Sequence, residues 1–153
     1  MSDEMFFARA LSEWLRPRQN LRWLVLGEMP HDALKFFAEQ TAASEIVWAH
    51  ANAPAAENAL GDVPLRAGDL HELARAAKLH DATLLWNALD VASDVNAFMA
   101  LISRVTRLYG IVAAVSRDLD KRTLWDVWLD ARLNDVSTRA LPDNSGWMVR
   151  GMR

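Results

Sequence analysis

The chain has 153 residues, of which 52% are hydrophobic and 24% are charged. This length and balance indicate one soluble globular domain with a full core, and the absence of cysteine excludes disulfides and thiolate metal sites. The net charge of −3 gives no reason to expect nucleic acid as a partner. An acidic start without a long apolar run predicts no signal peptide, no membrane span and a cytoplasmic protein.

Helical and strand-like patterns alternate through the first half of the chain. Apolar side chains recur at helical spacing before Pro17, whereas the run before Gly27 is continuously apolar, like a buried strand. Pro64 indicates that the last segment of this half lies at the edge of a sheet, because proline cannot donate a ladder hydrogen bond. The predicted elements are helix 2–16, strand 21–26, helix 32–42, strand 46–49, helix 55–60 and strand 63–66.

The second half continues the alternation and then changes. A helix is predicted to begin after Ser93 or Asp94. Its apolar stripe runs to Leu108, and Gly110 stands where a C-terminal cap belongs. Near the end of the chain, the turn-forming residues 142–146 separate two strands, which predicts an antiparallel hairpin. The predicted elements are helix 70–78, strand 82–86, helix 95–108, strand 111–115, helix 123–133, strand 136–141 and strand 147–152.

These elements together predict an α/β fold. Strands that alternate with helices form a mostly parallel sheet with helices on both faces, and the terminal hairpin adds antiparallel strands. We therefore expect a Rossmann-like three-layer sandwich around a seven-stranded sheet. Residues 1–153 are predicted to form one domain, made of an N-terminal helix 2–16, a βαβ core 21–116 and a C-terminal helix and hairpin 121–153.

Three local strings add a family resemblance to this layout. Gly68-Asp69 precedes a short helix, His80-Asp81 introduces a strand, and residues 102–112 lead from a helix into the fifth strand. In this order they resemble a compact class I S-adenosylmethionine-dependent methyltransferase, and the similarity covers nearly the whole chain. The resemblance implies the fold predicted above, with S-adenosylmethionine as the cofactor, bound across the carboxyl ends of the first strands.

The resemblance places a cofactor pocket on Gly27, Glu28, His50 and Asp69. The first two follow the first strand, His50 ends the second, and Asp69 follows the third. In the family, an acid at the position of His50 accepts hydrogen bonds from both ribose hydroxyls, whereas a neutral imidazole offers one acceptor. Asp69 matches the family residue that binds the adenine amine, and it equally suits the cap of the helix that follows.

The loop after the first strand departs from the family pattern. The family has an acid at the position of Val25 and glycines at those of Met29 and His31, where small residues let the backbone approach the cofactor. The side chains of Met29 and His31 would take space that the cofactor needs, unless the loop swings away. Pro30 also removes a backbone donor.

Two functions are consistent with a chain that matches the family layout but departs from its cofactor loop. The first is a methyltransferase-like protein that has lost ordinary cofactor binding and acts as a structural or regulatory partner, either of another protein or in a homo-oligomer. The second is an active small methyltransferase with an altered loop, in which Asn87 is the candidate for positioning the methyl acceptor. Methyl transfer mainly needs alignment of donor and acceptor, so no catalytic base is assigned. Four histidines without compact ligand spacing predict no metal site.

Two further groups of side chains remain outside these hypotheses. Trp125 and Trp128 lie one helical turn apart, and they either pack in the core or present a surface to a partner. Small basic clusters are interpreted as solvated surface. They are Arg16, Arg18 and Arg22, and Lys121 with Arg122.

Overall fold

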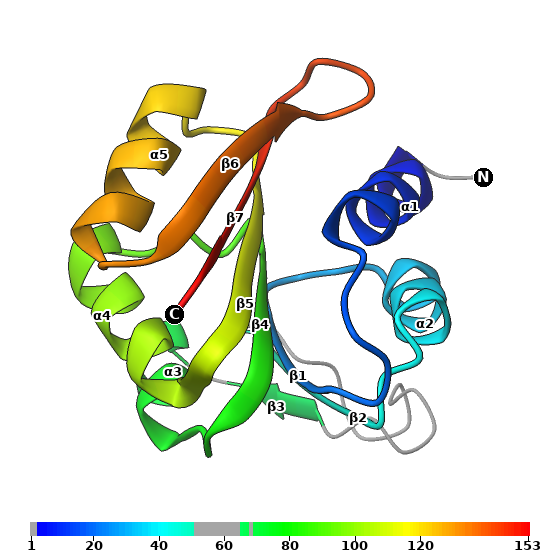
Figure 1. Cartoon of the computed structure of the whole chain (residues 1–153), viewed down its shortest axis with the longest axis horizontal. Coiled ribbons are helices and arrows are strands. Elements are labelled where there is room, and N and C mark those ends of the chain that lie inside the picture. The colour runs from blue at the N-terminus through cyan, green and yellow to red at the C-terminus, as the bar shows by residue number, and fades with distance from the viewer. Residues whose placement is uncertain (1–2, 51–64, 68) are drawn as a thin grey trace.

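The computed structural model describes residues 3–50, 65–67 and 69–153, and within them seven strands form one sheet with helices on both faces (Figure 1). The predicted helix 55–60, and residues 63 and 64 of the third predicted strand, lie outside the described residues. None of the described helices is long and apolar enough to cross a membrane. The elements are α1 Asp3–Leu15, β1 Arg22–Leu26, α2 His31–Gln40, β2 Glu45–His50, β3 Leu65–Ala67, α3 Leu70–Ala76, β4 His80–Trp86, α4 Val95–Val105, β5 Thr106–Ser116, α5 Lys121–Asp130, β6 Asn134–Ala140 and β7 Trp147–Met152.

The strand order is β3-β2-β1-β4-β5-β7-β6. Strands β1 to β5 are parallel, and β7 runs antiparallel between β5 and β6. This topology confirms the predicted α/β sandwich with its terminal hairpin, and β3 lies at the predicted edge of the sheet. Because the five parallel strands point the same way, the sheet has a carboxyl end, where they finish, and an amino end, where they begin.

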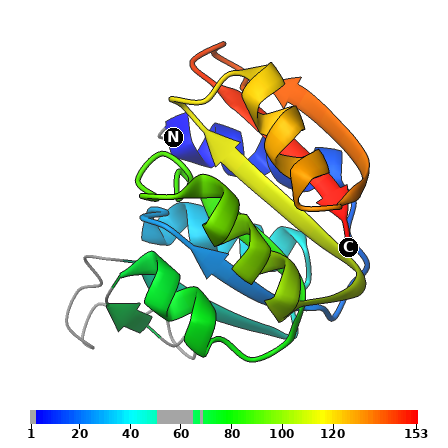
Figure 2. The same ribbon diagram turned by 90° about the vertical axis from the view of Figure 1, so that its left-hand side faces the viewer.

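Helices cover both faces of the parallel strands, which explains why those strands are continuously apolar. Helices α1 and α2 pack on one face, and α3, α4 and α5 lie side by side across the other (Figure 2). Side chains of β1 alternate between the two cores: Trp23 and Val25 lie under α1 and α2, whereas Leu24 and Leu26 lie on the opposite face. Full burial of one such aliphatic side chain stabilises the fold by about 1.5–3 kcal/mol.

Polar contacts fasten α1 to segments from the second half of the chain. The Trp14 carbonyl oxygen accepts a hydrogen bond of 3.0 Å from Arg150 of β7, whose guanidinium lies 5.0 Å from the centre of the Trp14 ring. At the start of α1, the Glu4 carboxylate accepts hydrogen bonds from Nε1 of Trp86, at 3.0 Å, and from the Arg117 guanidinium. The position of α1 therefore depends on residues up to 136 positions away.

The junction between α4 and β5 differs from the prediction. Helix α4 ends at Val105, Leu108 lies in β5 with 70% of its surface exposed, and Gly110 is a strand residue rather than a helix cap. A Cβ atom on Gly110 would lie 2.4 Å from the Asp81 carbonyl oxygen, so the close approach of β5 to β4 accounts for the glycine. The predicted helix is too long because Leu108 continues the helical spacing by sequence alone.

The two tryptophans of α5 have different environments. Trp128 is fully buried, and its Nε1 donates a 3.1 Å hydrogen bond to the Val112 carbonyl oxygen, which confirms the core interpretation for this residue. Trp125 is 38% exposed, and Leu129, one turn further along α5, is 49% exposed. Of the two tryptophans of α5, only Trp125 is therefore accessible from solvent.

Candidate functional site

The loop after β1 begins at Gly27, which adopts a φ of +120° that favours glycine. A Cβ atom there would lie 1.9 Å from the Trp86 carbonyl oxygen, so the close approach of the loop to β4 excludes any side chain. The Gly27 N–H donates a 2.9 Å hydrogen bond to the Ala49 carbonyl oxygen. Contacts with β4 and β2 within the protein therefore account for this glycine.

Trp48 of β2 packs in the core against the same loop. Its Nε1 donates a 2.7 Å hydrogen bond to the Gly27 carbonyl oxygen, and the residue is 2% exposed. The His31 ring, at the start of α2, meets the Trp48 ring edge-on with 5.1 Å between centres. The His50 ring, two residues further along β2, lies 4.7 Å from it. The loop is thus tied to β2 and lined by three aromatic rings.

Met29 does not lie where the sequence comparison suggested. It is 1% exposed and packs in the core under α1 and α2, near Phe7 and Leu34. It anchors the loop to this core, because a flexible apolar side chain adapts to the space there and is stabilised by burial. Of the two residues at family glycine positions, only His31 lies against the other pocket residues.

His50 is buried in the described structure, and neither of its ring nitrogens has a hydrogen-bond partner. Burial lowers the pKa of His50, the negative charge of Glu28 opposes that shift, and His31 adds to it. The imidazole is therefore neutral near pH 7, with one donor and one acceptor. Such a ring can accept a hydrogen bond from one ribose hydroxyl, whereas the family acid accepts one from each of two hydroxyls.

Asp69 forms the cap of α3. Its Oδ1 accepts hydrogen bonds from the N–H groups of His71, at 2.9 Å, and Glu72, at 3.2 Å, while the residue remains exposed. The His71 ring lies 5.3 Å from that of Phe98, and its Nε2 is buried without a partner. The capping role alone explains an aspartate at this position.

Asn87 follows β4 with a φ of +52°, a conformation that asparagine tolerates better than most residues. Its N–H donates a 2.9 Å hydrogen bond to the Val115 carbonyl oxygen, while its side-chain Oδ1 is buried without a partner. Nearby, the Asp90 carboxylate accepts hydrogen bonds from the Ser116 hydroxyl and, at 3.0 Å, from the Arg117 N–H. These bonds join the segments that follow β4 and β5.

The structure thus brings Gly27, His31 and His50 together around Trp48. Glu28 is exposed beside them, and its charge acts on His50. Sequence reasoning missed Trp48 as a site residue, although its spacing of two from His50 on a strand puts both on one face. In the described part of the chain, no three histidine or acidic side chains are arranged to hold a metal ion.

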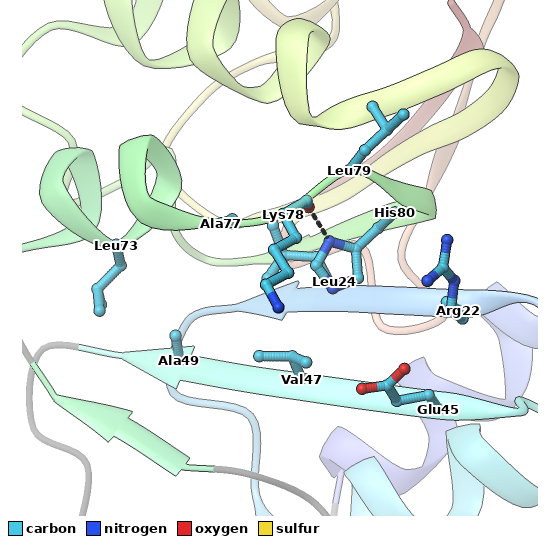
Figure 3. A pocket seen from close by; sticks show the side chains of 10 residues that line it. All are labelled: Arg22, Leu24, Glu45, Val47, Ala49, Leu73, Ala77, Lys78, Leu79 and His80. Carbon is cyan, nitrogen blue, oxygen red and sulfur yellow. Dashed lines mark hydrogen bonds between the residues drawn. The ribbon is translucent and has the colours of Figure 1, made fainter.

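A pocket of about 170 Å³ lies at the opposite, amino end of the sheet (Figure 3). Its apolar floor includes Leu24 and Val47, and the charged side chains of Arg22, Glu45 and Lys78 stand around it. The pocket is smaller than the roughly 300–1,000 Å³ of typical small-molecule sites. It is separate from the residues that the family resemblance assigns to the cofactor.

Solved structures of methyltransferases share this fold. A chain in the complex of the Haloferax volcanii Trm112 methyltransferase activator with a methyltransferase matches with a TM-score of 0.81 and 11% identity, covering 97% of this chain and 89% of that chain. A SAM-dependent methyltransferase from Archaeoglobus fulgidus gives a TM-score of 0.73 at 9% identity, with coverage of 95% and 94%. The cyclase SpnF gives 0.78 at 10% identity, with coverage of 97% and 80%. No family model and no curated protein matches the chain.

At this level of identity, the matches establish the fold and leave the activity to the residues. The chain has the fold of class I S-adenosylmethionine-dependent methyltransferases, as the sequence resemblance implied. Because a cyclase is among the proteins with this fold, the fold alone does not define one reaction.

Proposed function

We propose that this protein has a methyltransferase fold without ordinary cofactor binding and acts as a structural or regulatory partner, either of another protein or of a second copy. The observation that carries the proposal is the 2.7 Å hydrogen bond from Trp48 to the Gly27 carbonyl oxygen, with His31 and His50 against the same ring. Aromatic side chains thereby contact the loop where the family has glycines.

The residues that the resemblance assigns to S-adenosylmethionine fit it poorly, which supports the proposal. Both backbone polar groups of Gly27 are bonded within the protein. His50 is a buried neutral imidazole in place of an acid, and Oδ1 of Asp69 already accepts two N–H groups of α3. The Gly27 backbone groups are thus engaged within the protein, and His50 offers a single acceptor where the family has an acid that accepts from two hydroxyls.

An active small methyltransferase with an altered loop is the second candidate, and unsatisfied polar atoms favour it. Both ring nitrogens of His50, Nε2 of His71 and Oδ1 of Asn87 are buried without partners. Buried polar atoms are normally bonded, and leaving one unsatisfied costs about 1–3 kcal/mol. A ligand that reached these atoms would recover that energy, and Asn87 would then position the methyl acceptor.

Calorimetric titration with S-adenosylmethionine and S-adenosylhomocysteine separates the two candidates. The proposal predicts no binding at millimolar ligand by protein whose circular dichroism shows it folded. Micromolar binding would overturn the proposal and support the enzyme. In that case Asp69→Ser, which keeps a helix cap and removes the carboxylate, should weaken binding about tenfold. Asp94→Ser makes the same change at the cap of α4 and is the matched control.

Light scattering over a range of protein concentrations tests which partner is involved. A dimer that dissociates on dilution would identify a second copy of the chain. If the protein is a monomer at all concentrations, the proposed partner is a different protein. An isologous dimer interface would further need about 1,000 Å² or more of buried surface, which a crystal structure of the dimer measures.

A further inference from the structure

A larger cavity lies at the amino end of the sheet, away from the residues that the family resemblance selects. Its volume is about 470 Å³, and it lies between the connection from α1 to β1 and the start of β5. Arg16, Arg18 and Arg107 line it, and Tyr109 forms part of its wall. This volume falls within the roughly 300–1,000 Å³ of sites that bind small ligands.

An irregularity in β5 holds Tyr109 in solvent. His80 pairs with Thr106 and Ala82 pairs with Ile111, so residues 107–110 of β5 stand opposite Asp81 alone of β4. Tyr109 has a φ of +65°, which is unfavourable for an aromatic residue, and its N–H donates a 2.9 Å hydrogen bond to the Arg153 carbonyl oxygen. Tyr109 is 83% exposed beside an exposed Leu108.

The amino end also carries an excess of positive charge. Six cationic side chains gather there: Arg16, Arg18, Arg22, Lys78, Arg107 and Arg153. Two carboxylates from the linings oppose them. Glu45 lines the smaller pocket in Figure 3, and Asp81 lines the larger cavity, 3.7 Å from Arg22 and 3.4 Å from Arg107. The first two arginines form no ion pair within the described residues. A chain with a net charge of −3 thus presents a positive patch at one end.

We propose that this positive patch binds single-stranded nucleic acid. The Tyr109 ring provides a platform on which a base stacks, the arginines contact phosphates, and the cavity accepts one nucleotide. Base faces are accessible in a single strand and hidden in a duplex, so the projecting ring favours the single strand. The proposal goes beyond the proposed function and holds whether or not the carboxyl end binds a cofactor. The net charge gave no reason to expect nucleic acid, because it averages the charges of both ends of the sheet.

Fluorescence anisotropy with labelled single-stranded oligouridylate and oligothymidylate tests the proposal. The protein is expected to bind both at low salt. With three phosphate contacts, a fourfold rise in salt should weaken binding roughly 10- to 20-fold. Tyr109→Ala should weaken it about tenfold, whereas Tyr109→Phe keeps the ring and should change it little. The side chain is exposed, so both variants are expected to fold, which circular dichroism checks.

Two double variants, each removing two cations, test the location of the site. Arg16→Ala combined with Arg18→Ala should weaken binding about tenfold and make it less dependent on salt. Lys121→Ala combined with Arg122→Ala removes the same charge from α5 and should leave binding unchanged. Equal losses from both pairs, or no binding by the intact protein at low salt, would overturn the proposal.

A duplex and polyglutamate test whether the basic surface binds double-stranded nucleic acid or an acidic protein instead. A duplex of the same length should bind more weakly than the single strand, because it offers no free base face to Tyr109. Duplex binding as tight as that of the single strand would overturn the proposal. Displacement of the oligonucleotide by polyglutamate, together with no effect of Tyr109→Ala, would also overturn it and indicate a surface for an acidic protein.

Discussion

At the carboxyl end of the sheet, Gly27 and His50 of the expected site are bonded or buried within the protein, whereas at the amino end arginines and a tyrosine face solvent. At the first end, Trp48 donates a hydrogen bond to the Gly27 carbonyl oxygen and Asp69 caps α3. At the second end, Arg16 and Tyr109 border an open cavity. The topology alone directs attention to the carboxyl end, where open α/β sheets usually bind ligands. The difference shows that in this chain the usual place for a site and the residues available to form one lie at opposite ends.

The charges divide in the same way. Acidic side chains follow four of the parallel strands at the carboxyl end: Glu28, Asp69, Asp90, Asp118 and Asp120. The amino end has six cationic side chains. The carboxyl end also carries Arg117, Lys121 and Arg122, whereas the excess of cations at the amino end attracts an anionic ligand, although the net charge conceals it.

Glycine replacements at the two ends should give the largest difference. Gly27→Ala is expected to lower the free energy of unfolding by about 3–4 kcal/mol, because it combines a positive φ with a clash against the Trp86 carbonyl oxygen. Gly110→Ala, which meets the Asp81 carbonyl oxygen without a positive φ, should cost about 2 kcal/mol. Urea denaturation measures both losses, and a larger loss at Gly110 would contradict this account.

The hydrogen bond that closes the carboxyl end can be tested with a matched pair of tryptophans. Trp48→Phe removes the donor to Gly27 and should cost about 1–2 kcal/mol more than Trp23→Phe. Trp23 is equally buried, but its Nε1 has no partner, so its replacement loses ring volume without a hydrogen bond. Equal losses in thermal or urea unfolding would mean that the bond does not hold the loop closed.

At the amino end, Asp81→Asn should change binding more than stability. Asparagine can still accept the hydrogen bond from the Arg22 N–H, so the loss of two partly exposed ion pairs should cost about 0.5–1 kcal/mol. Removing this carboxylate should strengthen oligonucleotide binding severalfold, because Arg22 and Arg107 are then less neutralised. Weaker binding by the folded variant, measured by anisotropy, would show that the arginines are not the phosphate contacts.

The smallest expected effect is on the pH dependence of stability, to which each end contributes one histidine. Burial lowers the pKa of His50 and of His80 below 6.5. The unfolded chain then binds protons more readily than the folded protein, so stability is retained above about pH 6.5 and falls as the pH decreases through that value. His50→Gln and His80→Gln should each flatten the decline of the urea midpoint. A midpoint that rises on acidification would contradict the assignment.

Most of the fold could be predicted because its signals are local. Continuous apolar runs mark the central strands, and the turn residues 142–146 mark the hairpin. The predicted end of α4 was wrong. Gly110 is needed for its close contact with Asp81 on a neighbouring strand, which the local sequence does not reveal. The extent of the domain over 1–153 and the cytoplasmic location stay predictions.

The candidate site was harder to predict for the same reason. The sequence places Gly27 and Asp69 at the carboxyl end, but the bond from Trp48 depends on how β2 packs beside the loop. Likewise, Arg16 and Arg18 are neighbours in the sequence, whereas Arg107 joins them only through the sheet topology. The sequence shows the cluster of Arg16, Arg18 and Arg22, but it does not show that Arg107 and Tyr109 lie beside it.

The attachment of α1 also fixes an order of events during synthesis. Glu4 and Trp14 leave the ribosome before their polar partners Trp86, Arg117 and Arg150, which follow 82 to 136 residues later. The first helix therefore waits, with part of its surface uncovered, while the sheet forms from the chain that follows. During that interval the nascent protein is open to chaperones or to misassociation, and β7 completes the attachment of α1 when it emerges.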